Sequence, residues 1–371
     1  MIVKKKKILH IIPAFNVGGA ERVVWHYARF LDKEKYEIIV ASSVEDGCLR
    51  PQFESLDINL FVGSRSRQGG RWAVFKSLKK YVEEFKPDLI HSHLFGGDLV
   101  AYLLLFFSKR KIKWVSTQHN VEWQTSFLRR FIWKYILRSA DKIIAVSDGV
   151  GVYCRANFNI KENKIKMIRN GIDLEKCLAV PTECFFQDKA LRLAIVGRLE
   201  QQKGHIYLFR ALSTLKNMDW WRLEIFGDGS LRDKLKIEAK KLGIENRIAW
   251  HGNIDDITRF YEWIDVVIQP SLWEGLSLAV MEAMASGRCV VASVPAGEEL
   301  IKPDETGILV KAGSAVQIAD AVRFLFLRKD EGKRMGEKAR EYARGNFDIK
   351  KNIREIERIY DDLLSKKEYD I

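Results

Sequence analysis

Two glutamates in an apolar segment are the first residues of this sequence whose types and spacing suggest chemistry. The stretch EGLSLAVMEAMASG predicts a buried helix, yet it contains Glu274 and Glu282. Carboxylates are rarely buried without a partner, so each is expected to face a ligand or a cation. Eight helical residues separate them by at most about 12 Å. Because a carboxylate accepts hydrogen bonds from hydroxyl groups, the pair could hold a hydroxylated ligand at two points. The structural alternative is that Glu274 caps the helix and Glu282 pairs with a lysine.

Two cations follow a predicted strand in the segment VGRLEQQKG. Arg198 can contact two anionic oxygens with its forked guanidinium and Lys203 adds a point charge, so the loop suits a pyrophosphate. The alternative is that both are ordinary solvated side chains. Three further residues stand near the expected start of the helix that contains Glu282, where backbone N–H groups favour phosphate: Gly275, Leu276 and Ser277.

Glycine-rich turns join predicted strands to helices at two further places. Gly18 and Gly19 precede an expected helix start, and Gly227 in FGDGS repeats the same design. The missing side chains let a ligand approach the backbone, whose free N–H groups favour an anion. Neither turn matches GxGxxG or the Walker A sequence, so dinucleotide and P-loop sites are unsupported. A glycine pair alone is more often only a tight turn.

Short apolar strands alternate with helix-length segments along most of the chain, which predicts parallel sheets covered on both faces. This alternation of strands and helices is interrupted at residues 172–189 and then resumes. We therefore expect two doubly wound domains, with ligands binding in a cleft between them. The expected boundaries are 1–178 for an N-terminal domain, 186–346 for a C-terminal domain, and 347–371 for a charged helix that crosses back to the N-terminal domain.

Composition limits the class of protein. The chain has 371 residues and a formal net charge of +13, and its longest uncharged apolar run, residues 99–107, is too short to cross a bilayer. The N-terminus lacks the pattern of a secretory signal and the five cysteines form no CxxC pair, so we expect a cytoplasmic protein with reduced thiols. Residues 1–185 contain 31 Lys and Arg against 19 Asp and Glu, and this excess predicts an anionic partner for the first half.

The segment FLRRFIWKYILR offers a candidate for that partner. Its spacing predicts one buried stripe, formed by Leu128, Phe131, Ile132, Tyr135 and Ile136. The outer side would then carry cations with two apolar residues among them, which suits an anionic lipid surface: Arg130, Trp133, Lys134, Leu137 and Arg138. The alternative is that the tryptophan and the second leucine pack under a neighbouring loop. No nucleic-acid-binding signature accompanies the charge.

The motifs taken together are more specific than any one of them. GGAE, GRLEQQKG, FGDG and PSLWEGLSLAVMEAMASG, in this order, resemble the retaining glycosyltransferases of family 4, which have two Rossmann-like domains in the GT-B fold. The resemblance implies that Glu274 contacts the hydroxyls of the donor sugar and Glu282 the ribose hydroxyls. It also implies that Arg198 and Lys203 hold the donor diphosphate beside Gly18 and Gly19.

Two histidines and one acidic position are interpreted from the same resemblance. His119, at a strand end in STQHN, matches the family's histidine near the reacting sugar, whereas His93 in HSHLFGGD is expected to lie in the core or behind that site. The family's Gly-Gly-Xaa-x-Glu loop is replaced by VPAGEEL, in which Glu298 or Glu299 could take the acidic position. The identity of the sugar therefore stays open.

The resemblance implies retaining transfer from a nucleoside diphosphate sugar, UDP-sugar first and GDP-mannose next, to a lipid-linked or cell-envelope glycan. No Asp-x-Asp motif lies in a suitable place, so no metal or other cofactor is expected. Two alternatives remain: a nucleotide-sugar 2-epimerase, and a non-catalytic nucleotide-sugar-binding protein. The sequence does not indicate the base, the acceptor or the oligomeric state.

Overall fold

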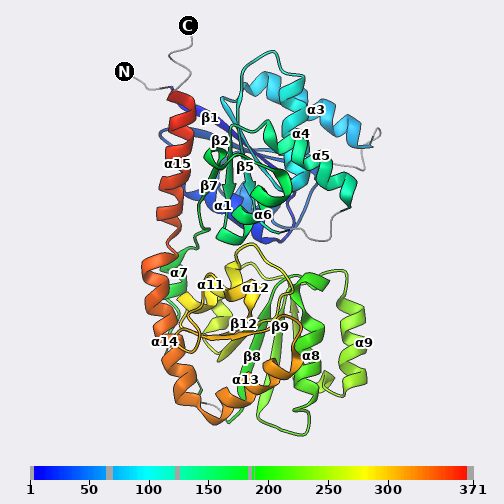
Figure 1. Ribbon diagram of the computed structural model, residues 1–371, viewed down its shortest axis with the longest axis vertical. Helices are drawn as coiled ribbons and strands as arrows, with labels where there is room; N and C mark the ends of the chain where they lie inside the picture. Colours follow the sequence, from blue (N-terminus) through cyan, green and yellow to red (C-terminus); the bar gives the residue numbers. More distant parts are fainter. Residues whose placement is uncertain (1–3, 64–69, 122–125, 183–185, 188, 366–371) are drawn as a thin grey trace. The chain divides into compact units, whose positions relative to one another are not determined.

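The computed structural model describes residues 4–63, 70–121, 126–182, 186, 187 and 189–365 (Figure 1). It divides the chain into two compact units, residues 1–170 with 349–371, and residues 171–348. Each unit contains a parallel sheet with helices packed on it. The two α/β units predicted from the alternation of strands and helices are confirmed.

The first unit has a seven-stranded sheet in the order β3-β2-β1-β4-β5-β6-β7. The chain leaves β1 toward β2 on one side and reaches β4 on the other, so the strand order reverses between β1 and β4. Ligands of doubly wound sheets bind at the carboxyl ends of the strands at such a reversal. The strands are β1 (Lys6–Ala14), β2 (Tyr36–Glu45), β3 (Asn59–Val62), β4 (Leu89–His93), β5 (Lys113–Gln118), β6 (Lys142–Ala145) and β7 (Ile165–Met167).

Helices connect these strands, and the last helix of the chain also packs on this unit. Tyr36 of β2 donates a hydrogen bond of 2.6 Å to Asp361, and the backbone N–H of Asp32 donates one of 2.9 Å to Glu357. These contacts attach α15 to the first unit (Figure 1). The helices of the unit are α1 (Gly19–Phe30), α2 (Arg50–Glu54), α3 (Gly70–Phe85), α4 (Leu94–Phe106), α5 (Phe127–Arg138), α6 (Asp148–Phe158), the 3-10 turn η1 (Glu162–Lys164) and α15 (Ile349–Ser365).

The predicted orientation of α5 is wrong. Leu128, Phe131 and Tyr135, expected in a buried stripe, expose 67%, 62% and 64% of their surfaces. Trp133 and Leu137, expected on the outer side, are fully buried. The helix is therefore rotated relative to the prediction, and its exposed apolar face consists of residues that periodicity had assigned to the core.

A buried carboxylate explains the orientation of α5. Both faces of this helix carry apolar residues spaced by three and four, so periodicity alone could not choose between them. The Nε1–H of Trp133 donates a hydrogen bond of 2.8 Å to Asp98 of α4, which is fully buried. Leaving a buried carboxylate without such donors costs more than exposing apolar side chains. Ile136 is buried as predicted, whereas Ile132 is exposed.

The second unit has a six-stranded sheet in the order β10-β9-β8-β11-β12-β13. Its order reverses between β8 and β11, which places a second switch point there. The unit begins at Gly171, so residues 171–178 belong to it rather than to the first unit. Its strands are β8 (Leu191–Val196), β9 (Trp221–Phe226), β10 (Ile248–Gly252), β11 (Val266–Gln269), β12 (Cys289–Ser293) and β13 (Ile308–Val310). Its helices are α7 (Leu174–Leu178), η2 (Gln201–Lys203), α8 (His205–Ser213), α9 (Arg232–Leu242), η3 (Glu245–Arg247), α10 (Thr258–Tyr261), α11 (Leu278–Ala285), α12 (Val294–Gly297), α13 (Ala315–Leu327) and α14 (Lys329–Asn346).

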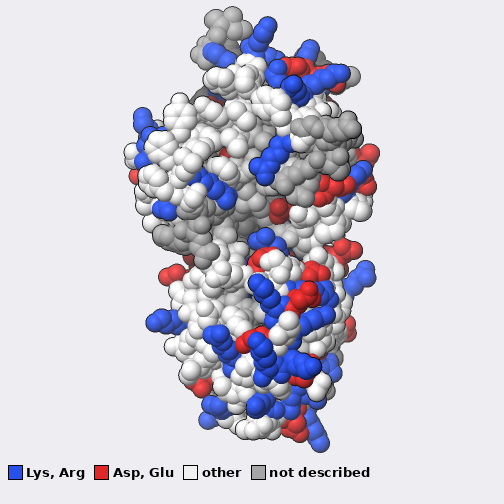
Figure 2. Space-filling model, turned by 90° about the vertical axis from the view of Figure 1, so that its right-hand side faces the viewer, with Lys and Arg blue, Asp and Glu red and all other residues white. Residues whose placement is uncertain are grey.

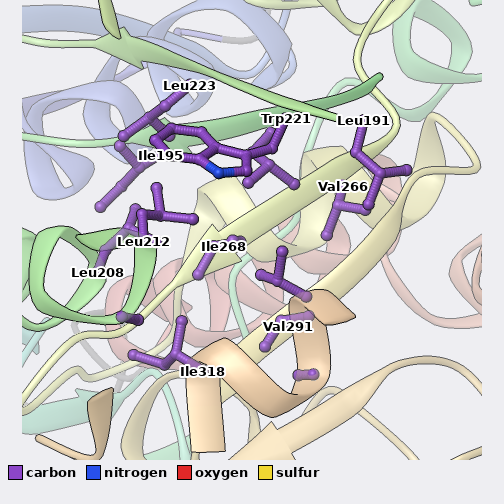
Figure 3. Packing of buried hydrophobic residues seen from close by; sticks show 14 of the residues in the cluster. Leu191, Ile195, Leu208, Leu212, Trp221, Leu223, Val266, Ile268, Val291 and Ile318 are labelled. Atoms are coloured by element: carbon purple, nitrogen blue, oxygen red, sulfur yellow. The ribbon is translucent and has the colours of Figure 1, made fainter. Parts of the chain in front are cut away.

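The core of the second unit packs around the central strands (Figure 3). Leu191 and Ile195 of β8 meet Val266 and Ile268 of β11, with the Trp221 ring above them. Parallel strands covered on both faces need near-continuous apolar runs, which is why β8 reads LRLAIV. This packing fixes the strand ends from which the loops of the candidate site extend. None of the described helices is both long and apolar enough to span a membrane.

Candidate active site

The candidate site of the second unit lies in two loops at its switch point. One loop follows β8, and the other joins β11 to α11. Glu274 lies in the second loop, four residues before α11 begins at Leu278. The helix predicted for the stretch EGLSLAVMEAMASG therefore begins later than expected. The Ser271 hydroxyl donates a hydrogen bond of 2.8 Å to Glu274 Oε1 and helps to hold the carboxylate in this loop. Glu282 lies within α11, as predicted.

Lys203 and Glu274 form an ion pair. Lys203 Nζ lies 2.5 Å from Glu274 Oε1, and the two side chains are only 15% and 8% exposed. From the described part of the chain, Glu274 Oε2 receives one long contact, of 3.4 Å from Gln202 Nε2. The lysine therefore orients the carboxylate, while Oε2 retains capacity to accept hydrogen bonds from a ligand hydroxyl.

Gln202 connects the two loops, and sequence reasoning missed it. Its Nε2 donates a hydrogen bond of 2.9 Å to the Trp273 carbonyl, and Arg198 contacts its Oε1 at 3.4 Å. Gln202 is nearly fully buried, whereas Arg198 is exposed. The available signal was the placement of an amide between two cations in RLEQQKG. Ser271 was also missed, because a serine before an apolar helix looks like an ordinary turn residue.

Glycines bring the strand ends of this unit close together. Gly227 has φ +134°, and a Cβ there would collide with the Gly197 carbonyl at the end of β8. Gly204 has φ +69°, and a Cβ there would collide with the Pro270 carbonyl after β11. The loops after β8, β9 and β11 can approach each other only because these side chains are missing. Gly227 thus shapes the loop that carries Arg198.

The start of α11 carries a polar side chain that no described residue hydrogen-bonds. Ser277 is the N-cap residue and is 3% exposed, yet its hydroxyl makes no hydrogen bond to any described residue. Gly275 and Leu276 precede it. The first N–H groups of a helix favour an anion, so this turn suits a phosphate. Glu282 lies further along the helix, near enough to the Cys177 thiol of α7 to help burial raise its pKa.

The first unit brings the predicted histidines together. His119 Nε2 lies 2.9 Å from His93 Nδ1, and His93 Nε2 lies 3.2 Å from His10 Nδ1. Burial lowers the pKa of His119 and of His10 to about 3, which keeps both rings neutral at pH 7. His93 therefore stands directly behind His119. His10 is a residue that the sequence did not single out.

The other predicted residues occupy varied positions. Gly18 is the N-cap of α1 and Gly19 its first residue, and a Cβ at Gly18 would collide with Glu21. Glu298 is exposed and Glu299 partly buried, just after α12. Of the residues expected at a lipid surface, Arg138 is exposed, Arg130 and Lys134 are partly buried, and Trp133 and Leu137 lie in the core.

Solved structures share this fold across nearly the whole chain. Anabaena HepE in complex with UDP and glucose matches with a TM-score of 0.84 at 20% identity, covering 96% of this chain and 99% of that one. Sucrose-phosphate synthase from Thermosynechococcus elongatus matches with a TM-score of 0.80 at 20% identity, covering 98% of this chain and all of that one. Two Rossmann-like units, each built on a parallel sheet, make up the GT-B fold, as predicted.

Family comparisons make the assignment narrower. The model described as "Glycosyltransferase Family 4" matches residues 17–176, and that described as "Glycosyl transferases group 1" matches residues 183–342. An Escherichia coli relative, UDP-Gal:alpha-D-GlcNAc-diphosphoundecaprenol alpha-1,3-galactosyltransferase, is 25% identical, with 98% of each chain covered. This chain belongs to the group 1, family 4 glycosyltransferases. The resemblance predicted from its motifs is confirmed.

Proposed function

We propose that this glycosyltransferase moves a sugar from a UDP-sugar, with retention of anomeric configuration, to a hydroxyl of a lipid-linked or cell-envelope glycan. The observation that carries the proposal is the Lys203–Glu274 pair at the switch point, which leaves Glu274 Oε2 able to accept hydrogen bonds. UDP is favoured over GDP-mannose because the E. coli relative is named for UDP-Gal. That name, with its diphosphoundecaprenol acceptor, also supports a lipid-linked acceptor.

The site residues divide the work of this reaction. Arg198, Lys203 and the N–H groups beside Ser277 stabilise the diphosphate as it leaves, which makes a metal unnecessary. A preorganised donor of this kind is worth about 3 kcal/mol in the transition state. Glu274 holds hydroxyls of the donor sugar, and Glu282 holds the ribose.

Bond making and breaking take place on one face of the sugar. The bond from the anomeric carbon to the phosphate oxygen breaks as the bond to the acceptor oxygen forms. The acceptor's proton passes to the leaving phosphate oxygen. Gly18 and Gly19 leave room for the diphosphate, and His119 contacts the sugar. Either Glu298 or Glu299 completes the sugar site.

A ligand panel followed by a transfer assay tests the proposal. UDP-, GDP- and ADP-sugars at about 100 times their dissociation constants should raise the stability of the native state by roughly 2.7 kcal/mol if they bind. We expect UDP-sugars to raise the melting temperature and to support transfer to an undecaprenyl-diphosphate glycan. Glu274→Gln should lower kcat by about 100-fold or more while the melting temperature stays within a few degrees.

Three outcomes would contradict the proposal. Near-normal transfer by Glu274→Gln would remove the carboxylate from its role. Conversion of UDP-N-acetylglucosamine to its 2-epimer without an acceptor would favour the epimerase alternative. Binding of sugar nucleotides without turnover on any lipid-linked or glycan acceptor would favour a non-catalytic binding protein.

The proposed acceptor places the enzyme at a membrane surface, and the exposed face of α5 suits one. Phe127 is 83% exposed, and Leu128, Phe131 and Tyr135 lie on the same helix. The exposed Phe106 of α4 adds to them. Burying such side chains in an interface gains about 1.5–3 kcal/mol each. We define these five residues as the α5 face.

Cations accompany the α5 face. The exposed and partly buried cations of α5 and of the segment after α4 are Arg129, Arg130, Lys134, Arg138, Lys109, Arg110 and Lys111. Figure 2 shows blue side chains set among white ones on the upper, first unit. Each cation near an anionic membrane is worth about 1 kcal/mol, so we infer peripheral attachment to the cytoplasmic leaflet. Wild-type protein should co-sediment with phosphatidylglycerol vesicles at low salt, and no binding there would remove the inference.

A further inference from the structure

The three histidine rings behind the first unit's switch point form a continuous chain. The chain runs His119–His93–His10 through ring nitrogens 2.9 and 3.2 Å apart. Its two outer nitrogens, His119 Nδ1 and His10 Nε2, are buried and make no hydrogen bond to any described residue. We call these three residues the histidine chain.

The proton positions in the histidine chain are coupled. A neutral imidazole carries one N–H, so a ring that donates from one nitrogen must accept at the other. In one arrangement all three rings carry the proton on Nδ1, and His119 presents an N–H at the open end. In the other all three carry it on Nε2, and the outward N–H belongs to His10.

The two ends of the chain differ in depth. His10 is 0% exposed in the middle of β1, and it is enclosed by the rings of Tyr27 and His91. His119 follows β5 and keeps partial exposure. Either arrangement leaves one outer N–H that no described residue accepts, on His119 Nδ1 or on His10 Nε2. A buried N–H without a partner is costly, and only the partly exposed His119 ring lies where a ligand oxygen can accept from it. The arrangement with all protons on Nδ1 is therefore the favoured one.

The backbone fixes the middle ring of the chain. His93 is the last residue of β4 and the N-cap of α4, with extended φ and ψ. The next residue, Leu94, has φ +63°, a left-handed conformation that is strained for a non-glycine residue. This sharp turn at the switch point keeps the His93 ring between its two partners.

We propose that His93 and His10 are positioning residues that hold His119 in its Nδ1–H form, so that His119 donates a hydrogen bond to a hydroxyl oxygen of the donor sugar. The sugar contact rests on the proposed function, whereas the proton arrangement does not. His119 then acts as a neutral donor rather than as a general base. The hydrogen bonds of His93 and His10 determine which nitrogen of His119 carries the proton.

A metal ion is the competing interpretation of the same rings. His10, His91 and His93 each offer a nitrogen within 4.8 Å of the others. His91 already hydrogen-bonds Tyr360 at 2.5 Å and Thr117 at 2.6 Å, and both nitrogens of His93 lie in the chain. A metal would have to displace these bonds, so the geometry favours the hydrogen-bonded chain.

Nitrogen NMR of the full-length protein labelled with ¹⁵N-histidine tests the proposal directly. Each ring's protonated nitrogen is identified by its shift, and resonances are assigned with single-histidine variants. We expect Nδ1–H at His119, His93 and His10, opposite to the Nε2–H form that a neutral histidine side chain favours in water. Nε2–H at His119 would overturn the proposal, and so would loss of the pattern on removal of bound metal with a chelator.

Variants extend the test to function. His93→Leu breaks the chain and should return His119 to the Nε2–H form, with kcat lowered on the order of tenfold to a hundredfold, the range seen for partners that orient metal-ligating histidines. His93→Gln can accept from His10 and donate to His119, and should restore both properties in large part. His26→Gln, at a buried histidine outside the chain, should change neither.

These readouts separate two kinds of failure. An unchanged His119 spectrum in His93→Leu would overturn the proposal even if the variant lost activity. If no sugar nucleotide supported transfer, the wild-type spectrum would still decide the proton arrangement. If His93→Leu did not fold, the wild-type and His93→Gln spectra would decide it.

Discussion

Asp98 is the residue that organises one layer of the first unit. Its Oδ1 accepts hydrogen bonds of 2.6 and 2.7 Å from the Ser92 and Ser116 hydroxyls. Its Oδ2 accepts bonds of 3.0 Å from Gln118 and 2.8 Å from Trp133. Burial raises the pKa of this carboxyl, and the four donors act against that rise. The network therefore couples β4, β5, α4 and α5 through one side chain.

Trp133→Phe should be costly because it removes one donor from this network. A hydrogen bond to a charged group contributes about 1.5–3 kcal/mol, so we expect a loss of that order in the free energy of unfolding, measured in urea. Trp221→Phe is the matched control, since its Nε1–H donates to the neutral carbonyl of Leu215 at 2.9 Å. A typical neutral bond contributes about 1 kcal/mol. Equal losses in both variants would show that Asp98 is not charged or not dependent on Trp133.

At the scale of elements, α5 separates what the sequence can predict from what it cannot. Apolar runs predicted the central strands of both sheets, because a buried parallel strand admits few other residues. Helix α5 has two apolar faces, and the choice between them depends on Asp98, which lies 35 residues before Trp133. No local pattern contains that information.

The candidate site divides in the same way. Glu274, Lys203 and the glycines of the turns belong to motifs with fixed spacing, so the sequence could single them out. Gln202 and Ser271 became visible only when the loops after β8 and β11 met at the switch point. His10 lies in the middle of an apolar strand, and only the register of β1 with β4 brings it to the other histidines.

The α5 face makes a prediction about membrane binding. Leu128→Ser with Phe131→Ser should lower the partition constant onto phosphatidylglycerol vesicles by about tenfold or more, because each side chain contributes at least about 1.5 kcal/mol when buried. Leu327→Ser is the matched control, since this leucine of α13 is equally exposed, at 69%. Sedimentation of vesicles at low and high salt measures both. Unchanged vesicle binding by the double variant would show that the α5 face is not the membrane contact.

At the scale of the whole molecule, the two units repeat one architecture with different contents. The second unit places cations, a glutamate and the start of α11 at its switch point. The first unit places buried neutral histidines behind its own switch point. This division suggests that the two units differ in their response to acid.

Acid should destabilise the first unit more than the second. The first unit holds four histidine rings of this kind, His10, His91, His93 and His119, and burial lowers the pKa of each below the ordinary value of 6.5. In the second unit, the pKa of His205 is lowered to about 3. As the pH falls below about 6.5, the histidines of the unfolded chain bind protons, whereas the buried rings of the native state stay neutral. Stability then falls by up to about 1.4 kcal/mol per pH unit for each such ring.

The carboxyls do not reverse this comparison. Burial raises the pKa of Asp98 in the first unit and of Asp265 in the second. A raised pKa makes the native state bind the proton first, which adds stability as the pH falls, once in each unit. The difference of three histidines therefore remains, and it amounts to roughly 4 kcal/mol per pH unit between about pH 5.5 and 4.

Buried cysteines report on each unit separately. Cys154 lies in the first unit and Cys289 in the second, and both are buried. We expect the urea midpoint for pulse labelling of Cys154, with a thiol reagent active at both pH values, to fall more between pH 7 and pH 5 than that of Cys289. His10→Gln removes one titrating ring and should reduce the shift for Cys154 alone. Equal shifts at both cysteines, unaffected by His10→Gln, would mean that the buried histidines do not set the acid response.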